Sequence, residues 1–334
     1  MISPGSPSLV KCHYFPLFHR LVIKSLFDMK KNKNVFKRSF FYVVISFVAI
    51  LMCIGCEKNI NVKIQPYQGM LSIQCMLVAG EVPRLYLSQS TGFFSSQITP
   101  ADLFVPGARV IISSPETRDS LITTMGRDSF YCQDTYFYQG KFQVKQGLTY
   151  TMEVSYEGKT YRSTTTVNQL KPKIDQVGYI SAFKDIYGEH EGVVVGFTDT
   201  PGQVNAYRVE MSRQIDSSAR KTETAYKSEC NGAHFFTVKE VGRAIYFDTG
   251  SGDGRQVSVT VEPTYSHRKG SIAQVYLQAM DPSSARFFDQ LDKQKLATSN
   301  PFVEPVFLTS NIEGCIGVFG HYIRSKPVQF IYPE

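Results

Sequence analysis

The sequence predicts a mainly β protein with two β-sandwich domains, of the immunoglobulin or fibronectin type, and one short helix near the C-terminus. After residue 66, apolar and polar residues alternate in short runs, and glycine and proline residues separate these runs. Such alternation is typical of strands with one buried face. Tyrosine, phenylalanine, threonine and valine are abundant there, and these side chains favour strands. From Cys56 to Glu334 the chain has room for two domains of ordinary size.

A leader with the pattern of a bacterial lipoprotein signal peptide precedes the strands. Residues 30–38 are rich in lysine and arginine, residues 39–54 carry no more charge, and Gly55 stands directly before Cys56. We therefore interpret residues 29–55 as the signal peptide and predict cleavage between Gly55 and Cys56. Lipid on the Cys56 thiol would then anchor the mature chain to the outer membrane through several acyl chains.

Two alternatives to this interpretation are an uncleaved membrane anchor and a coincidental match. The apolar run is shorter than the roughly 20 residues that usually span a bilayer, which disfavours the anchor. Cys53 occupies a position where such signals usually carry leucine, so the match is imperfect. Residues 1–28 show no targeting pattern, and we interpret them as an over-extended start or a disordered segment.

The net charge of +7 belongs to the leader. Residues 1–55 contain eight lysine and arginine residues against the single acid Asp28, which accounts for the whole excess. The chain from Cys56 onward is therefore neutral overall. Nucleic-acid binding depends on a basic surface that displaces counterions, so the sequence predicts no nucleic-acid partner.

The first half of the mature chain is predicted to form an N-terminal β-sandwich over residues 67–170. Residues 56–66 are polar, end at Pro66 and are interpreted as a tether. Glu157 and Gly158 have the composition of a tight hairpin turn. The alternating runs that we expect to form strands are 71–77, 84–90, 108–113, 120–124, 147–156 and 160–167.

A second β-sandwich is predicted over residues 171–334. Its start rests on Pro172, which cannot donate a hydrogen bond to a strand ladder and favours an extended linker. Residues 198–202 form a cluster that is typical of a turn. The strands expected in this half are residues 174–181, 192–197, 206–211, 256–261 and 273–279.

One helix is predicted over residues 282–296. Asp281 suits the N-cap and Pro282 the first helical position. Apolar residues then recur at helical spacing, so that one face can pack on a sheet. We interpret the segment as a helix that closes one end of the sandwich, in preference to a ligand-binding element.

Motifs for catalysis or cofactor binding are absent from the sequence. It contains no pair of histidines at zinc spacing, no Gly-x-Ser-x-Gly and no phosphate-binding loop. We therefore predict no cofactor and no enzymatic activity. The histidines of the mature chain are far apart in polar surroundings and are interpreted as solvated side chains: His190, His234, His267 and His321.

Two loops offer weaker candidates for binding. Residues 250–254 are rich in glycine and would suit an anion, but a hairpin loop is the simpler interpretation. Asp248 and Asp253 could meet Asp199 at a calcium site, although their spacing does not match an EF-hand loop.

A cluster of aromatic residues is the best candidate for a binding surface. Tyr131, Tyr136, Phe137 and Tyr138 lie close together in the chain. Exposed rings of this kind stack on glycans or on a protein partner. The alternative is that alternate rings belong to the core while the others cover the sheet.

The four later cysteines of the mature chain allow two interpretations. An oxidising compartment permits three disulfide pairings, and sequence does not choose among them. Alternatively they are free and buried as small apolar residues, which the wide spacing favours. The residues concerned are Cys75, Cys132, Cys230 and Cys315.

The C-terminal segment carries a resemblance to a known family. Asn300-Pro301-Phe302 is followed by Ser310-Asn311-Ile312-Glu313-Gly314 and then by Gly317-Val318-Phe319-Gly320. This ending resembles that of Bacteroidota outer-membrane lipoproteins that carry the domain of unknown function DUF4249. The resemblance implies no known catalytic residues. It also implies an accessory role beside TonB-dependent receptors, near which such proteins are often encoded.

The leading hypothesis is a lipid-anchored binding or accessory protein of the outer membrane, associated with TonB-dependent uptake and without catalysis. A surface hydrolase of glycans or peptides, with carboxylates assembled by the fold, is a second hypothesis. A structural or adhesive surface subunit is a third. Whether the protein faces the cell surface or the periplasm stays open.

Overall fold

The computed structural model describes residues 44, 69–91, 99–128, 133–185, 188–216, 235–247, 254–262, 270–299, 304 and 306–333. The chain divides into two compact units, Met1–Gln65 and Pro66–Glu334, and the architecture below belongs to the second. Gly55, Cys56 and every residue of the predicted signal peptide except residue 44 lie outside the described residues. In the described part, no helix combines the length and the apolar character that crossing a membrane requires.

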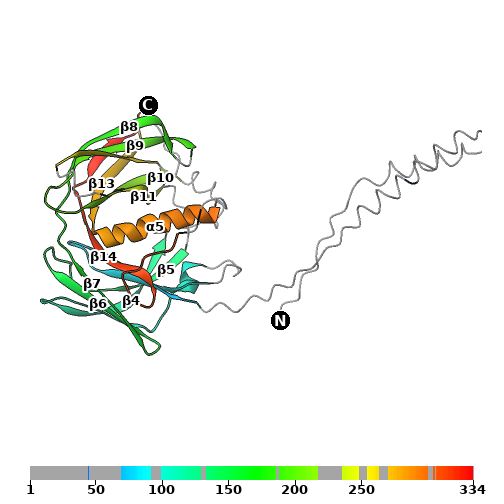
Figure 1. Cartoon of the computed structure of the whole chain (residues 1–334), viewed down its shortest axis with the longest axis vertical. Helices are drawn as coiled ribbons and strands as arrows, with labels where there is room; N and C mark the ends of the chain where they lie inside the picture. The colour runs from blue at the N-terminus through cyan, green and yellow to red at the C-terminus, as the bar shows by residue number, and fades with distance from the viewer. Residues whose placement is uncertain are drawn as a thin grey trace, which may run out of the picture. The chain divides into compact units, whose positions relative to one another are not determined.

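The second unit is mainly β and sandwich-like, as the sequence predicts (Figure 1). The elements before residue 170 are β1 (Leu71–Val78), β2 (Arg84–Gln89), the short helix α3 (Pro100–Leu103), β3 (Arg109–Ser113), β4 (Arg118–Asp128), β5 (Gln133–Gln139), β6 (Thr149–Tyr156) and β7 (Lys159–Thr166). Those after it are β8 (Ile174–Asp185), β9 (Gly188–Thr198), β10 (Ala206–Asp216), β11 (Phe235–Phe247), β12 (Gln256–Val261), β13 (Ile272–Met280), helix α5 (Pro282–Ser299), β14 (Ile316–Arg324) and β15 (Val328–Ile331).

One long sheet joins the two halves of the unit. Its order is β11-β10-β13-β14-β1-β2-β5-β4-β3-β6-β7, with β15 also paired to β13, while β12-β9-β8 form a smaller sheet. Strand β14 pairs in parallel with β1, so that Ser72 lies opposite Ile316, and antiparallel with β13. Residues on both sides of residue 170 thus share a sheet, and the division into two separate domains stays a prediction.

Two hydrophobic cores fill the two halves. The first combines inward-facing side chains of β1, β2, β3 and β6 with Phe319 and Ile323 from β14. On β1, Ile73, Cys75 and Leu77 are fully buried and alternate with more exposed neighbours, which is the pattern of a strand with one buried face. The second core lies between β9 and β12 of the smaller sheet and β10 and β13 of the long sheet.

The predicted hairpin between β6 and β7 is present. Glu157 has φ 48° and Gly158 has φ 75°, and Tyr156 pairs with Lys159. Two consecutive positive φ angles are typical of the two-residue turn whose twist matches that of the strands. Gly158 adopts this conformation without steric cost, so local sequence alone predicts the turn.

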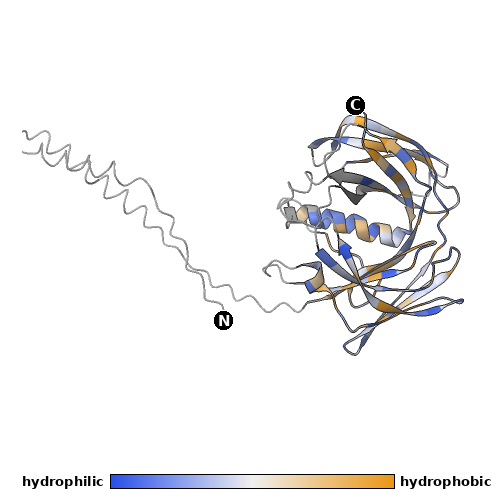
Figure 2. Cartoon of the chain, turned by 180° about the vertical axis from the view of Figure 1, so that it is seen from behind, coloured by the Kyte–Doolittle hydropathy of each residue, from blue (hydrophilic) through white to orange (hydrophobic). Residues whose placement is uncertain are grey.

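Helix α5 begins where the sequence predicts and extends to Ser299. Asp281 Oδ1 accepts a hydrogen bond from the Ser284 backbone N–H at 2.9 Å, as expected of an N-cap. Ala285 and Phe287 are buried, and hydrophilic and hydrophobic residues are interspersed along the helix (Figure 2). The helix packs on β14, β11 and β10 of the long sheet.

Candidate functional site

The aromatic residues that the sequence singles out divide between the two faces of the long sheet. Tyr138 is buried, and its hydroxyl donates to the Val105 carbonyl at 2.8 Å and accepts from the Ala108 N–H at 3.0 Å. Tyr136 is half-buried, and Phe137 is buried on the opposite face. Tyr131 lies outside the described residues. Tyr138 is therefore a structural residue of the core.

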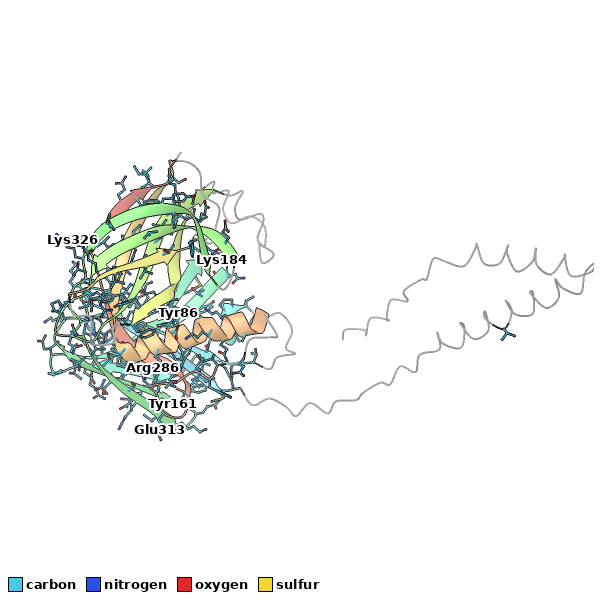
Figure 3. All side chains as sticks on the ribbon, turned by 45° about the horizontal axis from the view of Figure 1, so that its top comes forward. Tyr86, Tyr161, Lys184, Arg286, Glu313 and Lys326 are labelled. Carbon is cyan, nitrogen blue, oxygen red and sulfur yellow. The ribbon has the colours of Figure 1, made fainter. Side chains whose placement is uncertain are left out.

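The Phe137 side of the sheet carries an exposed aromatic and cationic surface. The Tyr86 ring is 43% exposed and lies 5.6 Å from the Phe137 ring, centroid to centroid. The guanidinium carbon of Arg84 lies 5.2 Å from the same Phe137 centroid. Tyr86 is labelled in Figure 3. Tyr86 and Arg84 do not stand out in the sequence, because an aromatic residue at an outward position of a strand is a weak signal.

Strand register extends this surface across three strands. Arg84 of β2 pairs with Gln139 of β5, which pairs with Ile122 of β4, and Ile122 is 54% exposed. Directly opposed residues share one face of a sheet. We call this surface the Tyr86 face, and it comprises Arg84, Tyr86, Ile122, Phe137 and Gln139.

The chemistry of the Tyr86 face suits binding. Tyrosine and arginine contribute most to binding energy at protein interfaces, because each combines a large contact area with hydrogen bonds. The Arg84 guanidinium stacks on a ring and so loses little freedom when a partner docks. We expect the face to bind a protein or a glycan and to take no part in covalent chemistry.

A second group of polar residues is buried where β14 meets helix α5. Asp281 Oδ2 accepts a hydrogen bond from the His321 backbone N–H at 2.9 Å. A Cβ atom at Gly320 would lie 1.7 Å from Ser284 Oγ and 2.5 Å from Asp281 Oδ2. Only glycine at this position lets the strand approach the helix so closely.

The ring of His321 connects this group to the N-terminal half. Its Nδ1 lies 2.7 Å from Thr165 Oγ1, and its Nε2 is hydrogen-bonded to Gln169 Oε1. A glutamine Oε1 only accepts, so His321 Nε2 carries the proton and Nδ1 accepts from Thr165. Burial lowers the pKa of His321, and the Asp281 charge opposes this effect. The ring is therefore neutral at pH 7.

The prediction that His321 is a solvated side chain is wrong, because the residue is only 2% exposed. The flanking residues Val318, Phe319, Tyr322 and Ile323 are mostly apolar, and β14 lies between β1 and β13 with most of its residues buried. The side chains of His190, His234 and His267 lie outside the described residues.

Ser284, His321 and Asp281 do not form a catalytic triad. Both ring nitrogens of His321 are engaged by Thr165 and Gln169, and Ser284 Oγ is buried without a hydrogen-bond partner. A triad needs the imidazole to bond the nucleophile on one side and the carboxylate on the other. We conclude that the cluster joins β7, β14 and α5 and has a structural role.

A third group of charged residues surrounds Arg324. Its guanidinium lies 3.1 Å from Glu81 Oε1 and 3.5 Å from Glu210 Oε2. Glu210 is buried and also accepts a hydrogen bond from Gln278 at 2.6 Å. Arg324 also packs on the Tyr276 ring at 5.3 Å. Since Glu210 is buried and held by two donors, we interpret this group as an ion-pair network.

Cys75 and Cys315 are free and buried. Burial raises the pKa of both thiols, that of Cys315 to about 11. They therefore remain protonated and behave as small apolar residues, one of the two predicted alternatives. Cys132 and Cys230 lie outside the described residues. Within the described ranges, no group of three or more His, Cys, Asp or Glu residues is suited to a metal ion.

Comparison with known families gives one match. Residues 57–326 match the family model described as domain of unknown function (DUF4249). The match begins one residue after Cys56 and covers both halves of the described fold. No curated protein matches the chain.

Proposed function

We propose that this chain, which belongs to the DUF4249 family, is a lipid-anchored accessory protein of the outer membrane that binds its partner through the Tyr86 face. In this proposal the partner is a TonB-dependent receptor, and the protein performs no catalysis. The exposed side chains of Tyr86 and Arg84, both packed on the buried Phe137 ring, carry the binding part of the proposal.

The leader supports the anchoring part of the proposal. The family match begins at Glu57, directly after the predicted lipidation site Cys56. Between Cys56 and Gly69, the first residue of the described fold, the chain advances 13 residues (69 minus 56) and extends at most about 45 Å. An anchor at Cys56 would therefore keep the folded unit close to the membrane.

Substitution of the predicted lipidation site tests the anchor. We expect Cys56→Ala to carry no acyl mass and to retain the leader, because lipidation of the cysteine precedes cleavage. The control is Ser46→Ala, within the apolar run of the same leader, which should leave both lipidation and cleavage unchanged. Fractionation and intact-mass spectrometry measure the outcome, and a Cys56→Ala protein that still carries lipid contradicts the proposal.

Co-purification from native outer membranes in gentle detergent tests the binding surface. We expect the full-length chain to recover a receptor in stoichiometric amount, and the double variant Arg84→Ser/Tyr86→Ser to recover at least tenfold less. Ile331→Ser is the matched control, because Ile331 is 56% exposed but belongs to β15 in the other half. Equal recovery by both variants excludes the Tyr86 face, and recovery of the lipoprotein alone excludes a stable receptor complex.

A further inference from the structure

Two buried side-chain oxygen atoms lack a hydrogen-bond donor in the turn that follows β9. They are Oδ2 of Asp199 and Oδ1 of Asn205. Each of these residues exposes only 1% of its surface to solvent. Buried polar atoms nearly always have a partner, because an unsatisfied one is costly. Two such acceptors in one turn point to a bound group that interacts with both oxygen atoms in place of a protein donor.

The remaining atoms of the turn hold both groups in place. Asp199 Oδ1 accepts hydrogen bonds from the Tyr207 hydroxyl at 2.6 Å and from Asn205 Nδ2 at 3.3 Å. Asn205 Nδ2 also donates to the carbonyl oxygens of Thr200 and Gln203 at 3.1 and 3.0 Å. With three oxygen neighbours, this atom must be the amide nitrogen. The amide orientation is thereby fixed, and Oδ1 is left as the unpartnered atom.

The turn also lies where the two sheets of the C-terminal half meet. The Asp199 backbone N–H donates to the Arg255 carbonyl, directly before β12 of the smaller sheet, at 2.9 Å. Tyr207, the side-chain partner of Asp199, belongs to β10 of the long sheet. A group bound here would therefore connect the two layers of the sandwich.

The charge of the turn favours a cation as the bound group. Asp199 has no ion pair with a described residue, and its side-chain donors are a hydroxyl and an amide. Neither a tyrosine hydroxyl nor an asparagine amide carries a positive charge. A buried carboxylate without a positive partner is unfavourable. Hard cations bind carboxylate, amide and backbone carbonyl oxygens, which are the groups present.

We propose that Asp199 Oδ2 and Asn205 Oδ1 are ligands of a hard divalent cation, of which calcium is the representative. Water and turn carbonyls complete its coordination shell. The site holds a single carboxylate among the described residues, so we expect affinity in the range of about 10⁻⁴ to 10⁻³ M, as for weak calcium modules. Unlike the sequence prediction, this site does not use Asp248 or Asp253, which lie outside the described residues.

Terbium luminescence tests the site directly. The chain contains no tryptophan, so terbium emission excited at the tyrosine band reports binding near a tyrosine such as Tyr207. In the full-length, detergent-solubilised and chelator-treated protein, we expect terbium emission that calcium displaces. Asp199→Asn should weaken terbium binding at least tenfold. Asp175→Asn is the matched control, because Asp175 accepts from Thr198 next to the turn yet is outside the site.

A second variant keeps the test informative if Asp199→Asn does not fold. Asn205→Ala removes the second ligand oxygen and should weaken terbium binding and reduce the rise in thermal midpoint that calcium causes. The proposal is wrong if the wild-type protein shows no terbium emission displaced by calcium. It is equally wrong if the Asp199→Asn protein binds terbium as the wild type does, because terbium then binds at a site that does not use Asp199.

Discussion

Single residues of the C-terminal segment show why this stretch of sequence is specific. The side-chain amide of Asn311 pairs with the backbone of Phe319 as a neighbouring strand would. Its Nδ2 donates to the Phe319 carbonyl at 2.7 Å, and its Oδ1 accepts from the Phe319 N–H at 2.9 Å. At Gly317, a Cβ atom would lie 2.0 Å from the Ile73 carbonyl oxygen. Asn311 thus bonds a residue of the same segment, whereas Gly317 meets a residue far away in the sequence, and local patterns do not reveal that second contact.

Substitution of Gly317 should therefore be costly. We expect Gly317→Ala to lower the free energy of unfolding by about 1–3 kcal/mol, because the new methyl group meets backbone atoms that cannot rotate away. Gly178→Ala is the matched control, since a Cβ atom on this other strand meets nothing within 4 Å. Urea unfolding followed by circular dichroism measures both, and equal stability of the two variants contradicts this account of Gly317.

His321 should make stability depend on pH. Burial lowers its pKa in the folded state below the ordinary 6.5, so the unfolded chain binds the proton more readily. The stabilising effect is complete above pH 6.5 and is lost as pH falls through the lowered pKa. We expect His321→Gln to be less stable at pH 7.5 but to show a flatter stability curve between pH 6.5 and about 5, before most carboxylates titrate. Parallel slopes for the two proteins in urea unfolding would exclude the histidine as the cause.

At the scale of elements, residues that are neighbours in the sequence predict the turns, caps and strands that these same neighbours determine. The β6–β7 turn, the N-cap at Asp281 and most strands follow from residues that are neighbours in sequence. Strand β5 escapes prediction because Tyr136, Phe137 and Tyr138 are all aromatic, which hides the alternation between faces. The sequence does not predict the Tyr86 face, because its residues come together only when β2, β5 and β4 pair in the correct register.

An ion pair joins helix α5 to β10. Arg208 donates to Asp292 Oδ2 at 2.7 Å and its guanidinium carbon lies 5.4 Å from the Phe288 ring centroid. Both side chains are largely buried. We expect Arg208→Met to destabilise the protein by about 2–4 kcal/mol, because it leaves a carboxylate without its main partner.

A second substitution should reverse this loss. In Arg208→Met/Asp292→Leu, apolar packing replaces the pair, so most of the stability should return. Lys293→Ala removes an exposed pair with Asp289 on the same helix and should cost less than about 0.5 kcal/mol. Thermal and urea unfolding measure all three, and a double variant that is no more stable than the single one contradicts the role of the pair.

At the scale of the whole molecule, the sequence predicts the class of fold but not its connectivity. Most of the first core comes from residues before Pro172, and the second core comes from residues after it. However, β14 supplies Phe319 and Ile323 to the first core from the far end of the chain. A pattern of alternating residues identifies a strand and its buried face, but it does not identify the neighbouring strand.

The shared sheet predicts that both halves unfold together. Because the sequence has no tryptophan, one can be placed in each core as a reporter: Phe142→Trp beside Tyr150, and Tyr246→Trp beside Tyr207. We expect the two single variants to show coincident urea transitions by fluorescence, and circular dichroism serves as the control for the global transition. Two separate midpoints within one protein would instead support independent domains.

The position of β14 has a consequence for the order in which this protein is made. Ribosomes and export machinery deliver a chain from its N-terminus, so β1 emerges long before its parallel neighbour. One side of β1 therefore stays unpaired, and the first half cannot complete its fold, until β14 near the end of the chain has been synthesised and exported. Pairing so distant in sequence is slow, and an unpaired edge attracts other chains in the meantime. A prematurely terminated copy would lack the strand that closes its first sheet, which makes such a copy an evident target for proteolysis.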